Sequence, residues 1–232
     1  IYFIAGDDDP APYYTAAHGS PAVMCDWVTA AQEAGAVYLD APVALEAGKC
    51  KVWLTPAALY LGMDIQGTRD TYARQLADME ADGSRYDADG GARYRARQYQ
   101  LDALDRTLAA IQEMAETDLQ IAVTHVPQDA EYIRTMLSWL STSEEVFSFR
   151  HVDLLMAGHY VGGQWRLPGG GAVWEPERGF FPPDEGLVGM QRVNSINQYI
   201  SPGLSDSAYY PLSGRMFNAP VGTLLQFTAK IE

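Results

Sequence analysis

The chain has 232 residues, of which 47% are hydrophobic and 20% charged, so it can bury a substantial core. Its formal net charge of -14 disfavours binding to nucleic acid or to an anionic membrane surface through its own field. Cys25 and Cys50 form neither a disulfide framework nor a zinc knuckle, and they leave the cellular compartment undetermined. No apolar run is long enough to span a bilayer, so we expect no membrane span within this segment.

The first part of the chain alternates predicted strands with one predicted helix. Residues 1–5 form an apolar run of strand length, followed by the turn sequence Gly6-Asp7-Asp8-Asp9-Pro10. A helix is predicted to begin at Ser20, a favourable N-cap, and to end at Gly35. Three short strands are then predicted at residues 37–39, 43–45 and 51–54.

Helices dominate the middle of the chain, and strands dominate its end. Helical spacing is seen at 68–80, 93–116 and 130–140, and the interruption at 82–91 is rich in Gly and Asp. Buried strands are predicted at 119–123 and 152–157, and further strands at 198–201 and 223–231. This order favours an α/β two-sheet sandwich with helices outside over a single wound sheet.

Three of the predicted strands end in polar residues suited to metal binding. Asp7 follows the strand at 1–5, His125 the strand at 119–123, and His159 the strand at 152–157. Ligands gather outside the carboxyl ends of parallel strands, and a set of carboxylate and imidazole groups suits zinc, manganese or iron. We therefore expect these three residues to share one divalent metal site.

Each of these features has an ordinary structural alternative. Three aspartates before a proline also form solvated turns, and a histidine at a strand end is often a hydrogen-bonded structural residue. The pair Gly162-Gly163 is a common turn former. The occurrence of three such strand ends in one chain favours the shared site.

The residues at these strand ends resemble the motifs of the calcineurin-like metallophosphoesterases. The segment from Gly158-His159 to Gly162-Gly163-Gln164 resembles the bacterial branch whose last metal motif reads Gly-His-x-His-Gly-Gly-Gln. Thr124-His125 resembles the family's single-histidine motif, and Gly6-Asp7-Asp8-Asp9 resembles its Gly-Asn-His-Asp/Glu motif. Residues 199–204 and 215–220 resemble that branch's closing strands.

The resemblance implies a four-layer α-β-β-α sandwich and hydrolysis of a phosphate ester by metal-bound hydroxide. It describes residues 1–232 as a single domain, equivalent to the later two-thirds of the family fold, with the first strands and two motifs expected upstream of residue 1. It assigns Asp7, His125 and His159 to a metal site for Mn, Fe or Zn. The substrate would be a small phosphate ester or a lipid-linked phosphate.

The chain departs from the family pattern at two positions that affect chemistry. Asp8 stands where the family has the histidine that protonates the leaving group; the resemblance gives Asp8 that catalytic role, but an ionised carboxylate is a poor acid. Val161 replaces the second histidine of the last motif and cannot bind a metal. Loss of the acid alone costs on the order of a hundred- to ten-thousandfold in rate. We therefore expect either a weakened phosphoesterase or an inactive relative that binds a ligand or a protein partner.

Other residues have both a functional and a structural interpretation. His18 can serve as a replacement acid or phosphate contact, or be an ordinary surface-turn histidine. Arg166 and Arg215 can bind a substrate phosphate through two donors, or pair with the surplus carboxylates. An aromatic group can line an apolar cleft or pack over a sheet edge; its members are Trp165, Trp174, Phe180 and Phe181.

Overall fold

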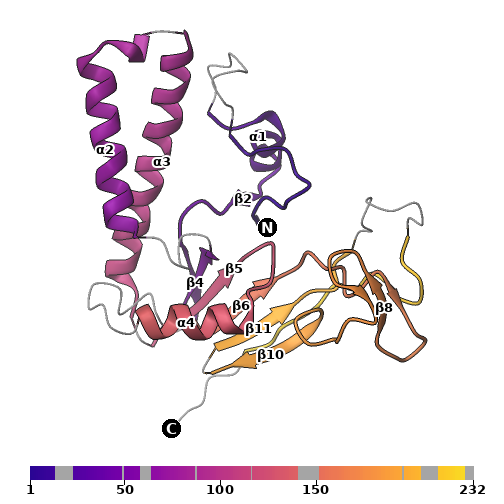
Figure 1. Ribbon diagram of the computed structural model, residues 1–232. Coiled ribbons are helices and arrows are strands. Elements are labelled where there is room, and N and C mark those ends of the chain that lie inside the picture. The colour runs from indigo at the N-terminus through magenta and orange to yellow at the C-terminus, as the bar shows by residue number, and fades with distance from the viewer. Residues whose placement is uncertain are drawn as a thin grey trace.

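The computed structural model is mixed α/β and describes most of the chain (Figure 1). The described residues are 1–13, 23–48, 50–57, 64–86, 88–115, 117–140, 152–194, 196–204 and 214–227, with the backbone alone at 88–90 and 136–140. Among these residues, none of the helices has both the length and the apolar character that crossing a membrane requires.

The centre of the molecule is a sheet in the order β10-β11-β6-β5-β4-β3. The four inner strands run parallel, and the two edge strands β3 and β10 run antiparallel to their neighbours. The bounds are β3 Val43–Ala47, β4 Cys50–Pro56, β5 Leu119–Val123, β6 Leu154–Ala157, β10 Gly189–Val193 and β11 Ile196–Ile200. The carboxyl ends of the neighbouring strands β5 and β6 therefore lie side by side.

Helices make two of the three connections between the parallel strands, and β7 to β10 lie in the third, between β6 and β11. Between β4 and β5 the chain forms a long helical hairpin, consisting of α2 Ile65–Ala81, the 3₁₀ turn η3 Ser84–Tyr86 and α3 Ala88–Glu113. Between β5 and β6 it forms α4 Ala130–Leu140, whose start is capped by Asp129 Oδ1, which accepts the backbone N–H groups of Glu131 and Tyr132. Figure 1 shows the hairpin extending well beyond the sheet and α4 lying beside it.

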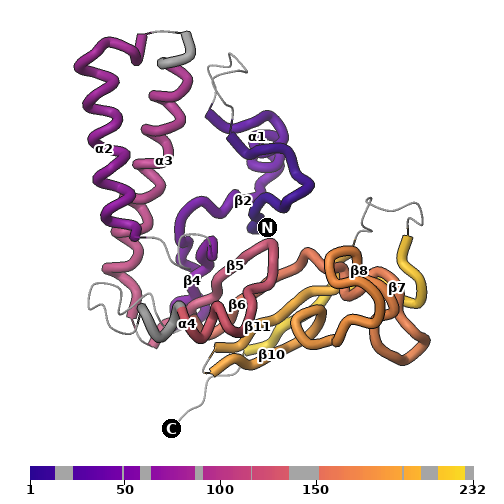
Figure 2. Tube along the Cα trace, viewed as in Figure 1, coloured from indigo at the N-terminus to yellow at the C-terminus, as the bar shows by residue number. Residues whose placement is uncertain are grey.

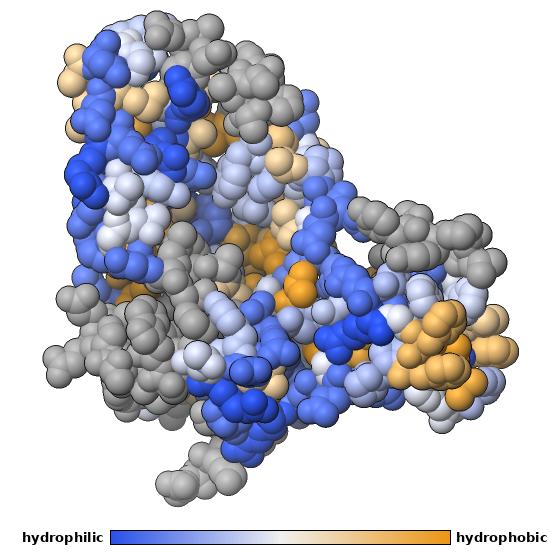
Figure 3. Space-filling view, viewed as in Figure 1, coloured by the Kyte–Doolittle hydropathy of each residue, from blue (hydrophilic) through white to orange (hydrophobic). Residues whose placement is uncertain are grey.

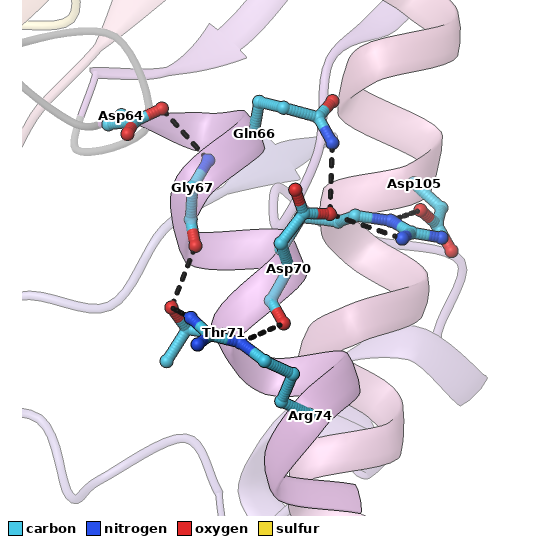
Figure 4. Close-up of polar contacts among 8 residues, drawn as sticks. Asp64, Gln66, Gly67, Asp70, Thr71, Arg74 and Asp105 are labelled. Carbon is cyan, nitrogen blue, oxygen red and sulfur yellow. Dashed lines mark hydrogen bonds and ion pairs between the residues drawn. The ribbon is translucent and has the colours of Figure 1, made fainter. Parts of the chain in front are cut away.

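Local polar contacts define the start of the helical hairpin (Figure 4). Asp64 is the N-cap of α2, because its Oδ1 accepts the N–H of Gly67 at 2.9 Å. The hydroxyl of Thr71 donates to the carbonyl of Gly67 one turn earlier. Arg69 then donates from Nε to Asp105 Oδ1 at 2.8 Å and so links α2 to α3. These contacts place the first turn of α2 beside the second helix.

The four inner strands of the central sheet present apolar residues to both faces. On the helical face, Ala122 and Leu155 pack with Ile133 of α4 in a cluster that also takes in residues of α2 and α3. On the opposite face, Ile121 and Leu154 pack with Tyr199 and neighbouring half-buried side chains. This two-sided burial explains why the strands appear in the sequence as continuous apolar runs.

A smaller unit at the N-terminus carries the first candidate ligand. Here β1 Tyr2–Phe3 pairs in parallel with β2 Val37–Tyr38, and α1 Asp26–Glu33 lies between them in the chain. Asp40, just after β2, accepts hydrogen bonds from both terminal nitrogens of Arg106 and from the hydroxyl of Tyr99, both on α3. These bonds fix the N-terminal unit on the helical hairpin.

The β7–β9 lobe lies at the opposite side of the molecule from the hairpin (Figure 2). Its sheet has the order β7-β8-β9, with bounds Trp165–Arg166, Ala172–Glu175 and Gly179–Phe180. Apolar atoms gather on its surface in Figure 3, and Phe180 and Phe181 are each 70% exposed. The aromatic group predicted to line a cleft or cover a sheet edge thus includes two residues open to solvent.

Several of the predicted elements were wrong in part. The strand predicted at 1–5 is a strand only at Tyr2–Phe3, and the interruption predicted at 82–91 is helical from Ala88. The helix predicted from Ser20 begins only at Asp26. Before it, Met24 bridges Tyr13 and the N–H of Cys25 donates to the carbonyl of Pro12, so the chain is extended at Met24 and Cys25. The predicted start at Ser20 lies outside the described residues. Within the strand predicted at 223–231, residues 223–227 are not a strand; Leu225 instead packs its side chain against the apolar sheet face.

Candidate metal site

The two candidate histidines follow neighbouring parallel strands. Val123 pairs with Met156 at the ends of β5 and β6, and the backbone ladder continues beyond them. Thr124 N–H donates to the carbonyl of Met156 at 2.9 Å, and Gly158 N–H donates to the carbonyl of His125 at 3.0 Å. The backbone of the sheet therefore sets His125 and His159 side by side, as the sequence predicted.

The loop after β1 brings a carboxylate to the same place. The N–H of Gly6 donates to Asp9 Oδ2 at 2.8 Å, which closes the loop and turns Asp7 toward the histidines. A Cβ atom on Gly6 would lie only 2.9 Å from Cε1 and 3.0 Å from Nδ1 of His125. Glycine is therefore required here for the loop to approach the imidazole this closely.

One ligand atom from each of the three residues lies close to the other two. His159 Nδ1 lies 3.0 Å from His125 Nε2, and Asp7 Oδ2 lies 3.4 Å from His159 Nδ1 and 3.7 Å from His125 Nε2. Adjacent ligands of a tetrahedral zinc ion, each at about 2.0–2.2 Å from it, are separated by about 3.4 Å. The three atoms thus have the types and the spacing of a divalent metal site, and this group could hold a metal ion.

The backbone around His159 is held in an uncommon conformation. His159 has φ 70° and Val161 has φ 45°, in the left-handed region that non-glycine residues rarely adopt. The side-chain amide of Asn218 donates to the carbonyls of both Val161 and Gly163 at 2.7 Å. Strained backbone of this kind is found preferentially at functional sites, where the surrounding structure maintains it.

A glutamate that sequence reasoning missed lies on the other side of His159. Glu177 Oε1 is 2.7 Å from His159 Nε2, and Glu177 lies in the turn between β8 and β9. Glu175, only 3% exposed, accepts the N–H groups of Glu177 and Arg178 and so shapes that turn. Burial raises the pKa of the Glu175 carboxyl. No spacing in the sequence distinguishes Glu177 from other turn glutamates.

A second missed residue supports the loop that carries His125. Gln198 of β11 is 1% exposed, and its side chain forms two hydrogen bonds with the backbone of Gln128. Gln128 N–H donates to Gln198 Oε1 at 2.8 Å, and Gln198 Nε2 donates to the carbonyl of Gln128 at 3.0 Å. These bonds tie the loop after β5 to the neighbouring part of the sheet.

Among the described residues, the other predicted site residues lie outside this group. Asp8 is exposed in the loop beside Asp7, and His18 falls outside the described residues. Arg166 donates to Asp184 Oδ2 at 2.8 Å and to the carbonyls of Gly162 and Gly170, so the alternative of pairing with a carboxylate is confirmed. It also lines a cavity of about 410 Å³. Arg215 likewise donates to backbone carbonyls.

Searches against protein-family models, curated proteins and solved structures found no match for this chain. The geometry of the site is therefore the basis for a functional hypothesis.

Proposed function

We propose that this chain is a divalent-metal-dependent phosphoesterase domain in which Asp7, His125 and His159 hold the metal. The observation that carries the proposal is the convergence of these three side chains, within 4.8 Å of one another, from three segments distant in the sequence. The resemblance of the same segments to metallophosphoesterase motifs supplies the reaction class. The four-layer sandwich and the extent of the domain, residues 1–232, belong to the same proposal.

The chain's own groups have defined roles in this site. Asp7 supplies negative charge opposite the cation, and the two imidazoles supply neutral nitrogen ligands. When bound, a divalent cation supplies Lewis-acid chemistry at a phosphate ester. Asp8 is exposed and next to Asp7, and the motif resemblance gives it the role of protonating the leaving group. A carboxylate is a weak acid for that step, so the expected activity is low.

A catalytically inactive scaffold that binds a ligand or protein partner is the second candidate. Val161 favours it, since valine replaces a metal-binding histidine in the resembled motif. The short contact between His125 and His159 also favours it, because an N–H···N hydrogen bond explains 3.0 Å without a metal. This function requires the fold but not the cation.

Metal analysis together with a hydrolysis assay separates the two candidates. The purified chain is loaded with Mn²⁺, Fe²⁺ or Zn²⁺, its metal content is measured after gel filtration, and hydrolysis of an aryl phosphate is followed. We expect about one ion per chain, lost in His159→Ala and kept in Glu46→Ala, an exposed carboxylate variant on β3. Metal uptake without hydrolysis supports the scaffold, and absence of uptake refutes the metal site.

A further inference from the structure

The two ring nitrogens of His159 face different carboxylates. Nδ1 points to the candidate metal position, 3.4 Å from Asp7 and 3.0 Å from His125 Nε2. Nε2 points away from that position and meets Glu177 Oε1 at 2.7 Å. A neutral imidazole carries one proton, so the partner of Nε2 determines whether the Nδ1 lone pair is free for a metal.

We propose that Glu177 is a positioning residue of the metal site, which holds the proton of His159 on Nε2 and thereby directs the Nδ1 lone pair at the cation. A carboxylate accepts only, so it selects the tautomer that donates from Nε2. The same bond fixes the rotation of the ring about its side-chain axis. Such outer carboxylate partners also raise the basicity of the ligating nitrogen. The inference rests on the proposed metal site and names a residue outside the three ligands.

The lobe that carries Glu177 is built to hold this turn near the histidine. Buried Glu175 binds two successive backbone N–H groups of the turn, at 2.9 Å and 2.7 Å. Arg178 places its guanidinium 4.4 Å from the ring centre of Tyr160, the residue after His159. The turn is thus attached to the histidine loop through a neighbouring residue as well as through Glu177 itself.

The Glu177 side chain contributes little to the core. It is 57% exposed, whereas the His159 side chain is 16% exposed. The main effect of its contact with Nε2 is therefore on the orientation of the His159 imidazole. Removing the carboxylate should change the tautomer and the metal affinity while the fold is kept. We expect metal binding to weaken about 10- to 100-fold, the range for loss of an outer partner.

The test uses the full chain and three variants: Glu177→Ala, Glu177→Gln and the control Glu185→Gln, which removes an exposed carboxylate from the same lobe. Zn²⁺ affinity is measured by competition with a chelator. The tautomer of His159 is assigned from ¹⁵N chemical shifts in the metal-free chain. Co²⁺ absorption reports the number of ligands, and circular dichroism reports folding.

We expect the wild-type chain to show the Nε2–H tautomer and Glu177→Ala to lose it together with 10- to 100-fold in Zn²⁺ affinity. Glu177→Gln, which retains an acceptor oxygen, should recover part of the affinity, and Glu185→Gln should match wild type. Unchanged tautomer and affinity in Glu177→Ala would overturn the role. A Co²⁺ spectrum with a different ligand number in Glu177→Gln would also overturn it, by making Glu177 a direct ligand.

The test of Glu177 as a positioning residue does not depend on phosphate-ester hydrolysis. A chain that binds Zn²⁺ with the expected Glu177 dependence but hydrolyses nothing refutes the proposed activity and supports the positioning role. A chain that hydrolyses the ester and binds metal equally well without Glu177 supports the activity and refutes the positioning role. A chain that binds no metal refutes both.

Discussion

Substitution of Gly6 by alanine tests whether the approach of the Asp7 loop to His125 determines metal affinity. The new Cβ would lie 2.9 Å from His125 Cε1 and 3.0 Å from Nδ1. Ordinary carbon contacts lie at about 3.5–4.0 Å, so either the ring or the loop must move by about 0.5–1 Å. The backbone angle of Gly6 is open to alanine, because its φ lies outside the left-handed region. The perturbation is therefore a local displacement.

The expected effect falls on the metal rather than on the fold. Ligand distances in a metal site tolerate about 0.2 Å, which is smaller than the displacement. We expect Gly6→Ala to lose about 10- to 100-fold in Zn²⁺ affinity, equal to about 1.4–2.7 kcal/mol. The imidazole of His125 is 32% exposed and can rotate, so we expect the free energy of unfolding to change by less than about 1 kcal/mol.

Gly158→Ala is the matched control, since it adds the same methyl group beside the same loop. A Cβ there meets only the carbonyl oxygen of His125, at 4.0 Å. Both variants are compared with wild type by chelator competition and by urea unfolding. Equal affinity in Gly6→Ala and wild type, or equal losses in the two alanine variants, would refute the steric reasoning.

Three further predictions concern stability, measured by urea unfolding. Burial raises the pKa of the Glu175 carboxyl, so the contribution of this side chain to the free energy of unfolding is greatest at low pH and is lost as the pH rises through that raised pKa. The stability of wild type relative to Glu175→Gln should therefore fall over that pH interval, and a difference that does not change with pH contradicts this. Asp40→Ala leaves Arg106 and Tyr99 without their shared acceptor and should lower the free energy of unfolding by about 2–4 kcal/mol. A decrease of less than about 0.5 kcal/mol would show that other contacts attach the N-terminal unit to the helical hairpin. Ile133→Ala, at 0% exposure, should cost about 2–5 kcal/mol, and a loss below 1 kcal/mol rejects its core position.

The convergence of the candidate ligands could be predicted because it follows from the strands. Two buried strands, predicted at 119–123 and 152–157, each end two residues before a histidine. Parallel pairing of β5 with β6 then places those histidines together, whatever lies between them. The α/β class follows from the same alternation of strands and helices.

The supporting residues could not be predicted in this way. Glu177 and Asn218 act from loops, where position depends on turns closed by particular side chains such as Glu175. The strand predicted at 223–231 failed at 223–227 for a related reason. An alternating pattern shows that Leu225 faces an apolar surface, but it does not show that the backbone pairs with a neighbour.

The placement of Asp7 has a consequence for how the N-terminus unfolds. Its strand β1 contributes two residues to a single pairing, and Asp7 belongs to the first loop after it. A cation bound by Asp7 and by the two histidines of the sheet would act as a reversible cross-link. It would join the residues of the site that lie farthest apart in the sequence. Detachment of the first strand and release of the ion would then be one event, so protection of the β1 amides against hydrogen exchange would rise with cation concentration.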